Sequence, residues 1–211
     1  MSTKPDGHAR RKAETRVKLL DAARTVFARQ GIDATRINEV TEEAGVGFGS
    51  FYNHFESKDA IVAAVMEEVA RAIGAAIDAA TADVDDPAEV VAIAHRVLIG
   101  QAVGDPEFGW LLLRLELSHD LATTALGPYA IRDLERGVAS GRFAVADPLV
   151  ALAATGGALL GVIRAVLQGR GGADPAEHHA AGVLRMLGVP ADEASEVAAR
   201  SLPAIEVRRS T

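Results

Sequence analysis

The sequence predicts an all-α fold of about nine or ten helices, and three observations support that prediction. Apolar residues recur at helical spacing along most of the 211-residue chain, without a convincing alternating strand pattern. Asp-Pro pairs, which favour helix starts, stand at 86–87, 105–106, 147–148 and 174–175. Glycines stand where the helices are expected to end, at positions 31, 104, 141, 169 and 188.

The first helix is expected to run from about residue 14 to residue 30 and to end at a glycine. Its apolar stripe consists of Val17, Leu20, Ala23 and Phe27. Thr35 is expected to cap a short second helix, because a hydroxyl there can accept a backbone hydrogen bond.

A long helix is expected to begin after Ser57, whose hydroxyl suits the cap position. The chain therefore divides into a flexible basic arm over 1–13, a compact head over 14–56 and a helical body over 57–211. The helices of the body follow the Asp-Pro and glycine signals described above.

Charge is distributed unevenly along the chain. Residues 1–36 hold nine Lys or Arg and four Asp or Glu, a balance of +5, whereas the net charge of the whole chain is −7. A basic head on an acidic protein indicates an anionic partner for the head alone. The alternative is a solvated, flexible basic tail.

The chain contains no cysteine, which excludes disulfides, thiolate metal sites and a cysteine nucleophile. This composition fits a cytoplasmic protein, and the polar first residues are unlike a secretory signal. The apolar run 149–167 has the length of a membrane span. Its wealth of Ala and Gly favours instead a helix buried within one protein or between two, so no membrane partner is expected.

The most specific signal is the segment 36–55, which reads RINEVTEEAGVGFGSFYNHF. Its pattern predicts two short helices joined by a tight turn at Gly45, with Val40, Phe51 and Phe55 facing inward. The second of these helices leaves hydroxyl, amide and imidazole groups exposed. Such groups suit contacts with phosphates and base edges.

With these residues the chain resembles the tetracycline-repressor (TetR) family of bacterial transcriptional regulators. The resemblance covers about residues 15–65, from FARQG at the end of the first helix through the segment ending in HFESKD. It implies an N-terminal helix-turn-helix DNA-binding domain followed by a helical ligand-binding and dimerisation domain. Thr41 and Gly47 depart from the family pattern, which usually has Ala and a Ser or Thr cap at these positions.

The resemblance also assigns DNA contacts to particular residues. Those expected at the major groove or its walls are Arg36, Phe48, Ser50, Tyr52, Asn53 and His54, and those expected at backbone phosphates are Gly47, Gly49 and Lys58. Tyr52 and His54 have the alternative of packing within the head. The basic arm is expected either to reach an adjacent minor groove or to remain a disordered tail.

Two helices of the body are expected to form a dimer interface, as the family pattern implies. The first has small residues on one face, Ala153, Gly157 and Gly161, and the second has an apolar face of Val183, Leu184 and Leu187. Two copies of the pair would form a four-helix interface around a two-fold axis. The alternative for these residues is the core of a monomer.

The family pattern also implies an inducer pocket in the body. The best source is the segment 106–121, which offers Trp110, Arg114 and Leu117, with Leu98 and Tyr129 from neighbouring helices. For each residue taken singly, the alternative is plain core packing. Arg114 differs because an unpaired buried charge is costly.

No catalytic, cofactor or metal site is expected. Glu116 and His119 have a spacing used in helical metal sites, but no second such pair accompanies them. The expected function is a homodimeric, ligand-responsive repressor that binds a palindromic double-stranded DNA operator and is released by a small-molecule inducer. The alternatives are a helical enzyme, which would turn over a bound molecule, and an architectural DNA binder that responds to no ligand.

Overall fold

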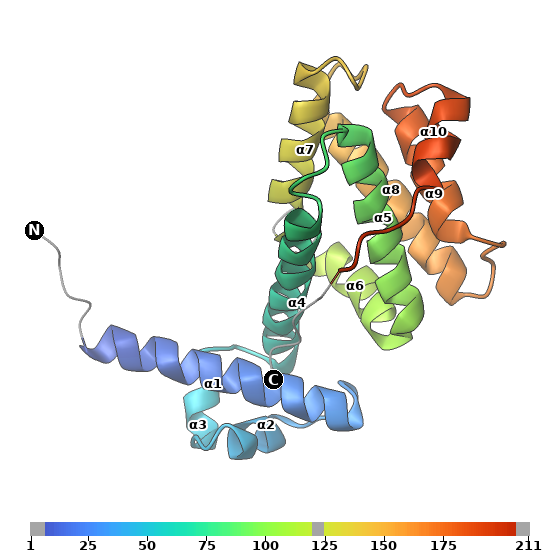
Figure 1. Ribbon diagram of the computed structural model, residues 1–211. Helices are drawn as coiled ribbons and strands as arrows, with labels where there is room; N and C mark the ends of the chain where they lie inside the picture. Colours follow the sequence, from blue (N-terminus) through green and yellow to red (C-terminus); the bar gives the residue numbers. More distant parts are fainter. Residues whose placement is uncertain (1–6, 120–124, 206–211) are drawn as a thin grey trace, which may run out of the picture. The chain divides into compact units, whose positions relative to one another are not determined.

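The computed structural model describes residues 7–119 and 125–205, except for the side chains of residues 114–119. This part of the chain holds ten helices and no strand (Figure 1), which confirms the all-α prediction. The helices are α1 (Gly7–Gln30), α2 (Ile37–Glu43), α3 (Phe48–Phe51), α4 (Lys58–Ala80), α5 (Pro87–Gly104), α6 (Pro106–His119), α7 (Gly127–Ala139), α8 (Pro148–Leu167), α9 (Pro175–Met186) and α10 (Ala191–Ala198).

The chain divides after Glu68 into two compact units. The first unit therefore includes the first turns of α4, whereas the predicted body begins at residue 57. Ile61 and Val62 of these turns are buried, and Arg24 of α1 forms an ion pair with Glu68. This burial and this ion pair are the physical reason why the boundary lies beyond residue 57.

Helix α1 begins earlier than predicted, because residues 7–13 of the expected arm are helical. No helix-breaking residue interrupts this stretch, and Arg10 pairs with Glu14 one turn later at 2.8 Å. Val17 does not belong to the core, since 55% of its surface is exposed. The other three residues of the predicted stripe are buried, and the complete buried face of α1 consists of Leu19, Leu20, Ala22, Ala23, Val26 and Phe27.

The turn between α2 and α3 has the predicted geometry. Gly45 has a φ of +65°, a left-handed conformation in which any other residue pays a steric cost. Val40 and Phe51 on either side of it are buried. The Ser57 hydroxyl accepts the Ala60 N–H at 3.1 Å and so caps α4 as expected. Thr35, in contrast, is buried and donates to the Gly31 carbonyl, so it does not cap α2.

Helix α5 is the centre of the second unit, where it contacts α6, α7, α8, α9 and α10. It begins as its Asp-Pro pair predicts, with the Asp86 carboxylate accepting the Ala88 N–H at 2.9 Å. Helix α8 begins in the same way, since Asp147 accepts the Leu149 N–H at 2.8 Å. The Asp-Pro signal therefore located these helix starts correctly.

The predicted dimer face on α9 is wrong. Val183, Leu184 and Leu187 are between 0% and 1% exposed and lie in the core of the second unit with Leu134 and Phe143. Helix α9 packs this face against α5 and α10, so the three side chains cannot touch a second chain.

The exposed surface of α8 is unusually apolar for a helix so little covered. Its most apolar 18-residue window has a mean hydropathy of 1.9, yet only 17% of that window is buried. By length and composition α8 is apolar enough to cross a membrane. Its exposed residues include Val150, Ala154, Gly157, Gly161 and Arg164, which recur at helical spacing along one face.

Candidate DNA-binding surface and ligand cavity

The residues expected to contact DNA lie on and around α3 in the first unit. Arg36, Gly47, Phe48, Gly49, Tyr52 and Asn53 are exposed, whereas Ser50, His54 and Lys58 are half-buried. Tyr52 packs edge-on against Phe48 and Phe51, with ring centroids 5.5 and 5.4 Å apart, yet remains 52% exposed. The aromatic contacts thus hold the ring in place while leaving its surface accessible.

Basic side chains of α1 lie near the same surface. The Arg16 guanidinium stands 5.2 Å from the centroid of the Phe55 ring. Burial, followed by repulsion from Lys12 and Arg16, lowers the pKa of His54 below its ordinary value. Two residues of the basic stretch thus add positive charge beside the α3 segment, where an anion would be attracted.

Lys58, at the start of α4, connects this helix to the loop before α2. Its Nζ donates to the Asp33 carbonyl at 3.1 Å. An ammonium group has three donors, so this bond leaves capacity for a phosphate. At the end of this loop, the Arg36 N–H donates to the Glu39 carboxylate of α2 at 2.7 Å, which lowers the pKa of Glu39.

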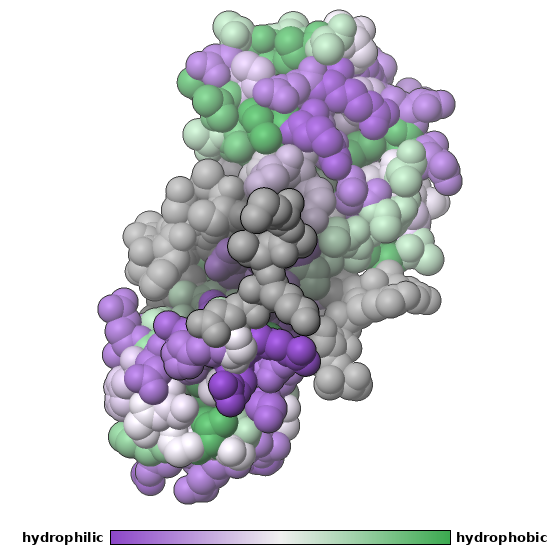
Figure 2. All heavy atoms as spheres, turned by 90° about the vertical axis from the view of Figure 1, so that its left-hand side faces the viewer, coloured by the Kyte–Doolittle hydropathy of each residue, from purple (hydrophilic) through white to green (hydrophobic). Residues whose placement is uncertain are grey.

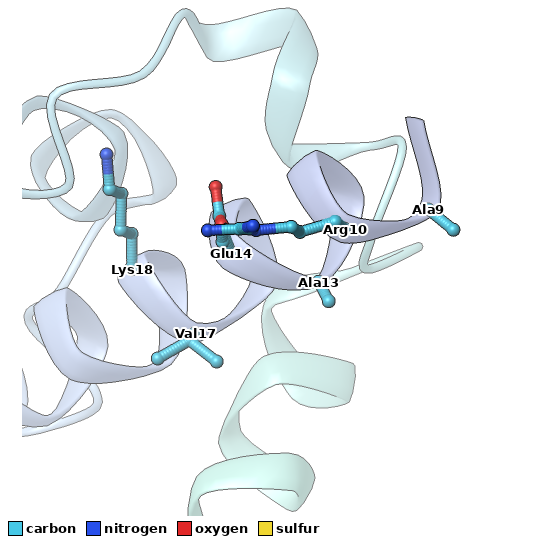
Figure 3. Close-up of a pocket in the computed structure, with 6 residues that line it drawn as sticks. All are labelled: Ala9, Arg10, Ala13, Glu14, Val17 and Lys18. Atoms are coloured by element: carbon cyan, nitrogen blue, oxygen red, sulfur yellow. The ribbon is translucent and has the colours of Figure 1, made fainter. Parts of the chain in front are cut away.

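The outer side of α1 carries a shallow hollow (Figure 3). Ala9, Ala13 and Val17 lie along one side of it, and Arg10, Glu14 and Lys18 along the other. All six residues come from one helix, so the hollow is an open surface rather than an enclosed site. Figure 2 shows hydrophilic side chains over much of the visible surface of the first unit.

The second unit contains a cavity of about 450 Å³, a size typical of small-molecule sites. Its wall is mainly apolar and comes from α4, α5, α7, α8 and the residues just before α7. The lining residues are Gly74, Ile77, Asp78, Val91, Ala94, His95, Leu98, Leu126, Gly127, Tyr129, Ala130, Arg132, Asp133, Leu134, Leu149, Leu152, Ala153, Thr155, Gly156, Gly157, Leu159 and Leu160.

Three charged residues form a cluster in the cavity wall. The Arg132 Nη2 atom lies 2.6 Å from Asp78 Oδ1 and 2.7 Å from Asp133 Oδ1, which ties α7 to α4. Asp133 is the most buried of the three, with a side chain 13% exposed. Burial raises the pKa of Asp133, although Arg132 opposes that effect.

Tyr129 reaches the wall because α4 has a glycine opposite it. A Cβ atom at Gly74 would lie 2.9 Å from the Tyr129 ring, closer than side chains tolerate. The Arg132 guanidinium lies 5.8 Å from the centroid of the same ring. Gly74 therefore allows the aromatic ring to lie against α4 beside the charged cluster.

The structure brings only some of the predicted pocket residues together. Leu98 and Tyr129 lie in the cavity wall, whereas Trp110 on α6 is 45% exposed and does not line the cavity. The side chains of Arg114 and Leu117, and those of Glu116 and His119, lie outside the described residues. Sequence reasoning missed the polar part of the wall, namely Asp78, His95, Arg132 and Asp133, although Asp78 interrupts an otherwise apolar run.

The small residues predicted for the dimer face of α8 are all exposed, and some of them also line the cavity. Ala153, Gly157 and Gly161 are all exposed on α8. Ala153 and Gly157 also line the cavity, whereas Gly161 does not.

The two units match two parts of one family. Residues 19–65 match the model described as bacterial regulatory proteins of the tetR family, and residues 86–200 match the tetracyclin repressor-like C-terminal domain. The second match alone covers more than half of the chain. The chain belongs to the TetR family. It is therefore a DNA-binding transcriptional regulator of the helix-turn-helix type.

Among solved structures, this TetR-family regulator is similar to RolR in complex with the ligand resorcinol. The two are 37% identical, with a TM-score of 0.85 over 94% of this chain and 100% of RolR. The chain is also 39% identical over 62 residues to the transcriptional repressor KstR2 of Rhodococcus jostii. That match spans 29% of this chain and only 30% of KstR2.

Proposed function

We propose that this chain is a homodimeric repressor that binds a palindromic operator in the cytoplasm and releases it when a small hydroxylated aromatic compound enters the cavity. The cavity with its Asp78, Arg132 and Asp133 cluster carries this proposal. The ligand must bind one arrangement of the dimer better than another, because only differential affinity shifts such an equilibrium.

The chemistry of the wall favours a hydroxylated ring. Leu98, Leu134 and Leu159 offer an apolar surface to the faces of a ring. A hydroxyl can donate to a carboxylate such as Asp133 and accept from the Arg132 guanidinium. The similar RolR was solved with resorcinol, a benzene ring with two hydroxyl groups, and this likeness supports the same ligand class here.

The uncovered face of α8 supports the dimer. A helix with this hydropathy and so little burial needs an apolar partner, and the same face of a second copy provides one. Exposed glycines at 157 and 161 let two helices approach closely. A palindromic operator also requires two DNA-binding domains, one for each half-site.

Asp133→Asn is expected to weaken resorcinol binding about 10- to 100-fold, because a hydrogen bond to a charged group is worth about 1.5–3 kcal/mol. Arg132 keeps its partner Asp78 in this variant. Titration calorimetry measures the change. Glu135→Gln, an exposed carboxylate of α7 outside the cavity, is the matched control and should bind like the wild type. Equal affinity of the wild type and Asp133→Asn would contradict the role given to this carboxylate.

At the DNA surface, substitutions of phosphate-contacting residues and of base-contacting residues are expected to have different effects on DNA affinity. Lys58→Ala should weaken binding to specific and non-specific DNA about equally. It should also reduce the slope of the logarithm of the binding constant against the logarithm of the salt concentration, by about one unit per lost phosphate contact. Loss of Asn53 or His54, if it reads a base edge, should cost about 1–3 kcal/mol on the operator and less on random DNA. Titrations of both DNAs at several salt concentrations test this. A Lys58 variant with altered base preference and an unchanged salt slope would be incompatible with a phosphate contact.

A further inference from the structure

A pair of histidines links the cavity wall to the core of the second unit. His95 of α5 lies in the wall, and its Nδ1 atom is 3.0 Å from Nε2 of His179 on α9. The centroids of the two rings lie 5.1 Å apart, and His179 is only 9% exposed. Burial lowers the pKa of His95 to about 3 and also lowers the pKa of His179, so both rings are neutral near pH 7.

The hydrogen-bonding capacity of His95 is only half used by this contact. A neutral imidazole has one N–H donor and one acceptor nitrogen, and the bond to His179 occupies Nδ1. Among the described residues, His179 is the side chain that hydrogen-bonds to the His95 ring. Nδ1 is engaged by His179 and His95 lines the cavity, so Nε2 is the ring nitrogen available to meet a molecule bound there.

We propose that Nε2 of His95 binds one hydroxyl group of the cavity ligand and that His179 holds the His95 ring in the orientation for this bond. The assignment rests on the proposed function and narrows its ligand class. The charged cluster comes from α4 and α7, whereas His95 comes from α5. A ring with two hydroxyl groups can engage both parts of the wall, whereas a ring with one hydroxyl group engages only one of them.

The neutral histidine pair has two possible tautomers, and a hydroxyl group can hydrogen-bond to His95 in both. If His95 donates to His179, its Nε2 accepts from the ligand, and if His179 donates, the Nε2–H of His95 donates to the ligand. A hydroxyl group can form a hydrogen bond in either arrangement, because it both donates and accepts. His179 acts through His95 and is a positioning residue.

The test compares resorcinol with phenol on the wild-type chain and on His95→Phe by titration calorimetry. The wild type is expected to prefer resorcinol about tenfold, the usual value of a buried hydroxyl hydrogen bond. His95→Phe keeps the ring volume but should lose most of this preference, with phenol affinity little changed. A variant that retains the wild-type preference overturns the assignment to His95 and leaves the proposed ligand class intact. A wild type that binds neither compound overturns both.

Two further measurements exclude a merely structural effect. His95→Asn places an amide near the Nδ1 position but has no atom at Nε2, so it should also lose the preference for resorcinol. The ¹⁵N chemical shift of His95 Nε2 should move when the wild type is saturated with resorcinol, and an unchanged shift would overturn the contact.

The positioning role of His179 is tested by two variants. His179→Gln should keep more of the preference for resorcinol than His179→Phe, because it can still hydrogen-bond to His95. Equal preference in the two variants would overturn the positioning role.

Discussion

Gly161→Leu in α8 is expected to raise the dissociation constant of the dimer roughly 30-fold to 10⁴-fold. Overpacking a close contact costs about 1–3 kcal/mol, and a two-fold interface contains each substitution twice. Within one chain, a Cβ atom at Gly161 meets nothing within 4 Å, so the added side chain has room in the protomer. The loss would therefore come from the partner chain, and sedimentation velocity over a concentration series measures it.

Gly100→Leu is the matched control for this substitution. Gly100 is an exposed helical glycine of α5, and a Cβ atom there also meets nothing within 4 Å. Gly157→Leu should also weaken the dimer, but Gly157 lines the cavity, so its effect mixes two sites. A Gly161→Leu dimer as tight as that of Gly100→Leu would remove this face of α8 from the interface.

Acid is expected to destabilise the second unit through the histidine pair. An unfolded His95 has a pKa near 6.5, whereas its folded pKa is about 3, so the unfolded state binds more protons between these values. The free energy of unfolding therefore falls as the pH falls below 6.5, by about 1.4 kcal/mol per pH unit from this residue. Between pH 6.5 and pH 5 the expected loss is about 2 kcal/mol.

The difference between the wild type and His95→Phe isolates this effect in urea unfolding at fixed protein concentration. Asp133, whose pKa is raised, contributes the opposite sign. His179 and His54, whose pKa values are lowered, contribute the same sign, as does Asp86 at lower pH. These groups are present in both proteins, so the comparison removes their common contributions. The Phe variant should lose about 2 kcal/mol less than the wild type over this pH range. Parallel pH dependence in the two proteins would show that His95 is not buried as a neutral ring.

The first unit could be predicted in detail because its signals are local. Gly45 marks a turn that needs a left-handed residue, and Phe51 and Phe55 follow it at helical spacing. The start of α1 differs from its prediction because a run of basic residues after Gly7 is also typical of a flexible arm. An Arg10–Glu14 pair at helical spacing instead supports another turn or more of helix.

The cavity could not be predicted in the same way, because its wall depends on contacts between distant segments. Asp78 and Arg132 are paired across two helices, and no local pattern gives that register. Trp110 is a large aromatic on an apolar helix, but periodicity does not say whether such a face meets a cavity or solvent. Periodicity likewise does not distinguish an apolar face that meets a partner chain from one that packs inside its own unit, as that of α9 does.

Operator binding with and without resorcinol tests the ligand-responsive repressor most directly. The wild-type chain first selects duplexes from a random library, and fluorescence anisotropy then follows the selected duplex during a resorcinol titration. The expected result is a palindromic duplex bound by two chains, with a dissociation constant that rises at least about fivefold and then saturates. An unchanged affinity at resorcinol concentrations that fill the cavity by calorimetry would contradict ligand-controlled repression.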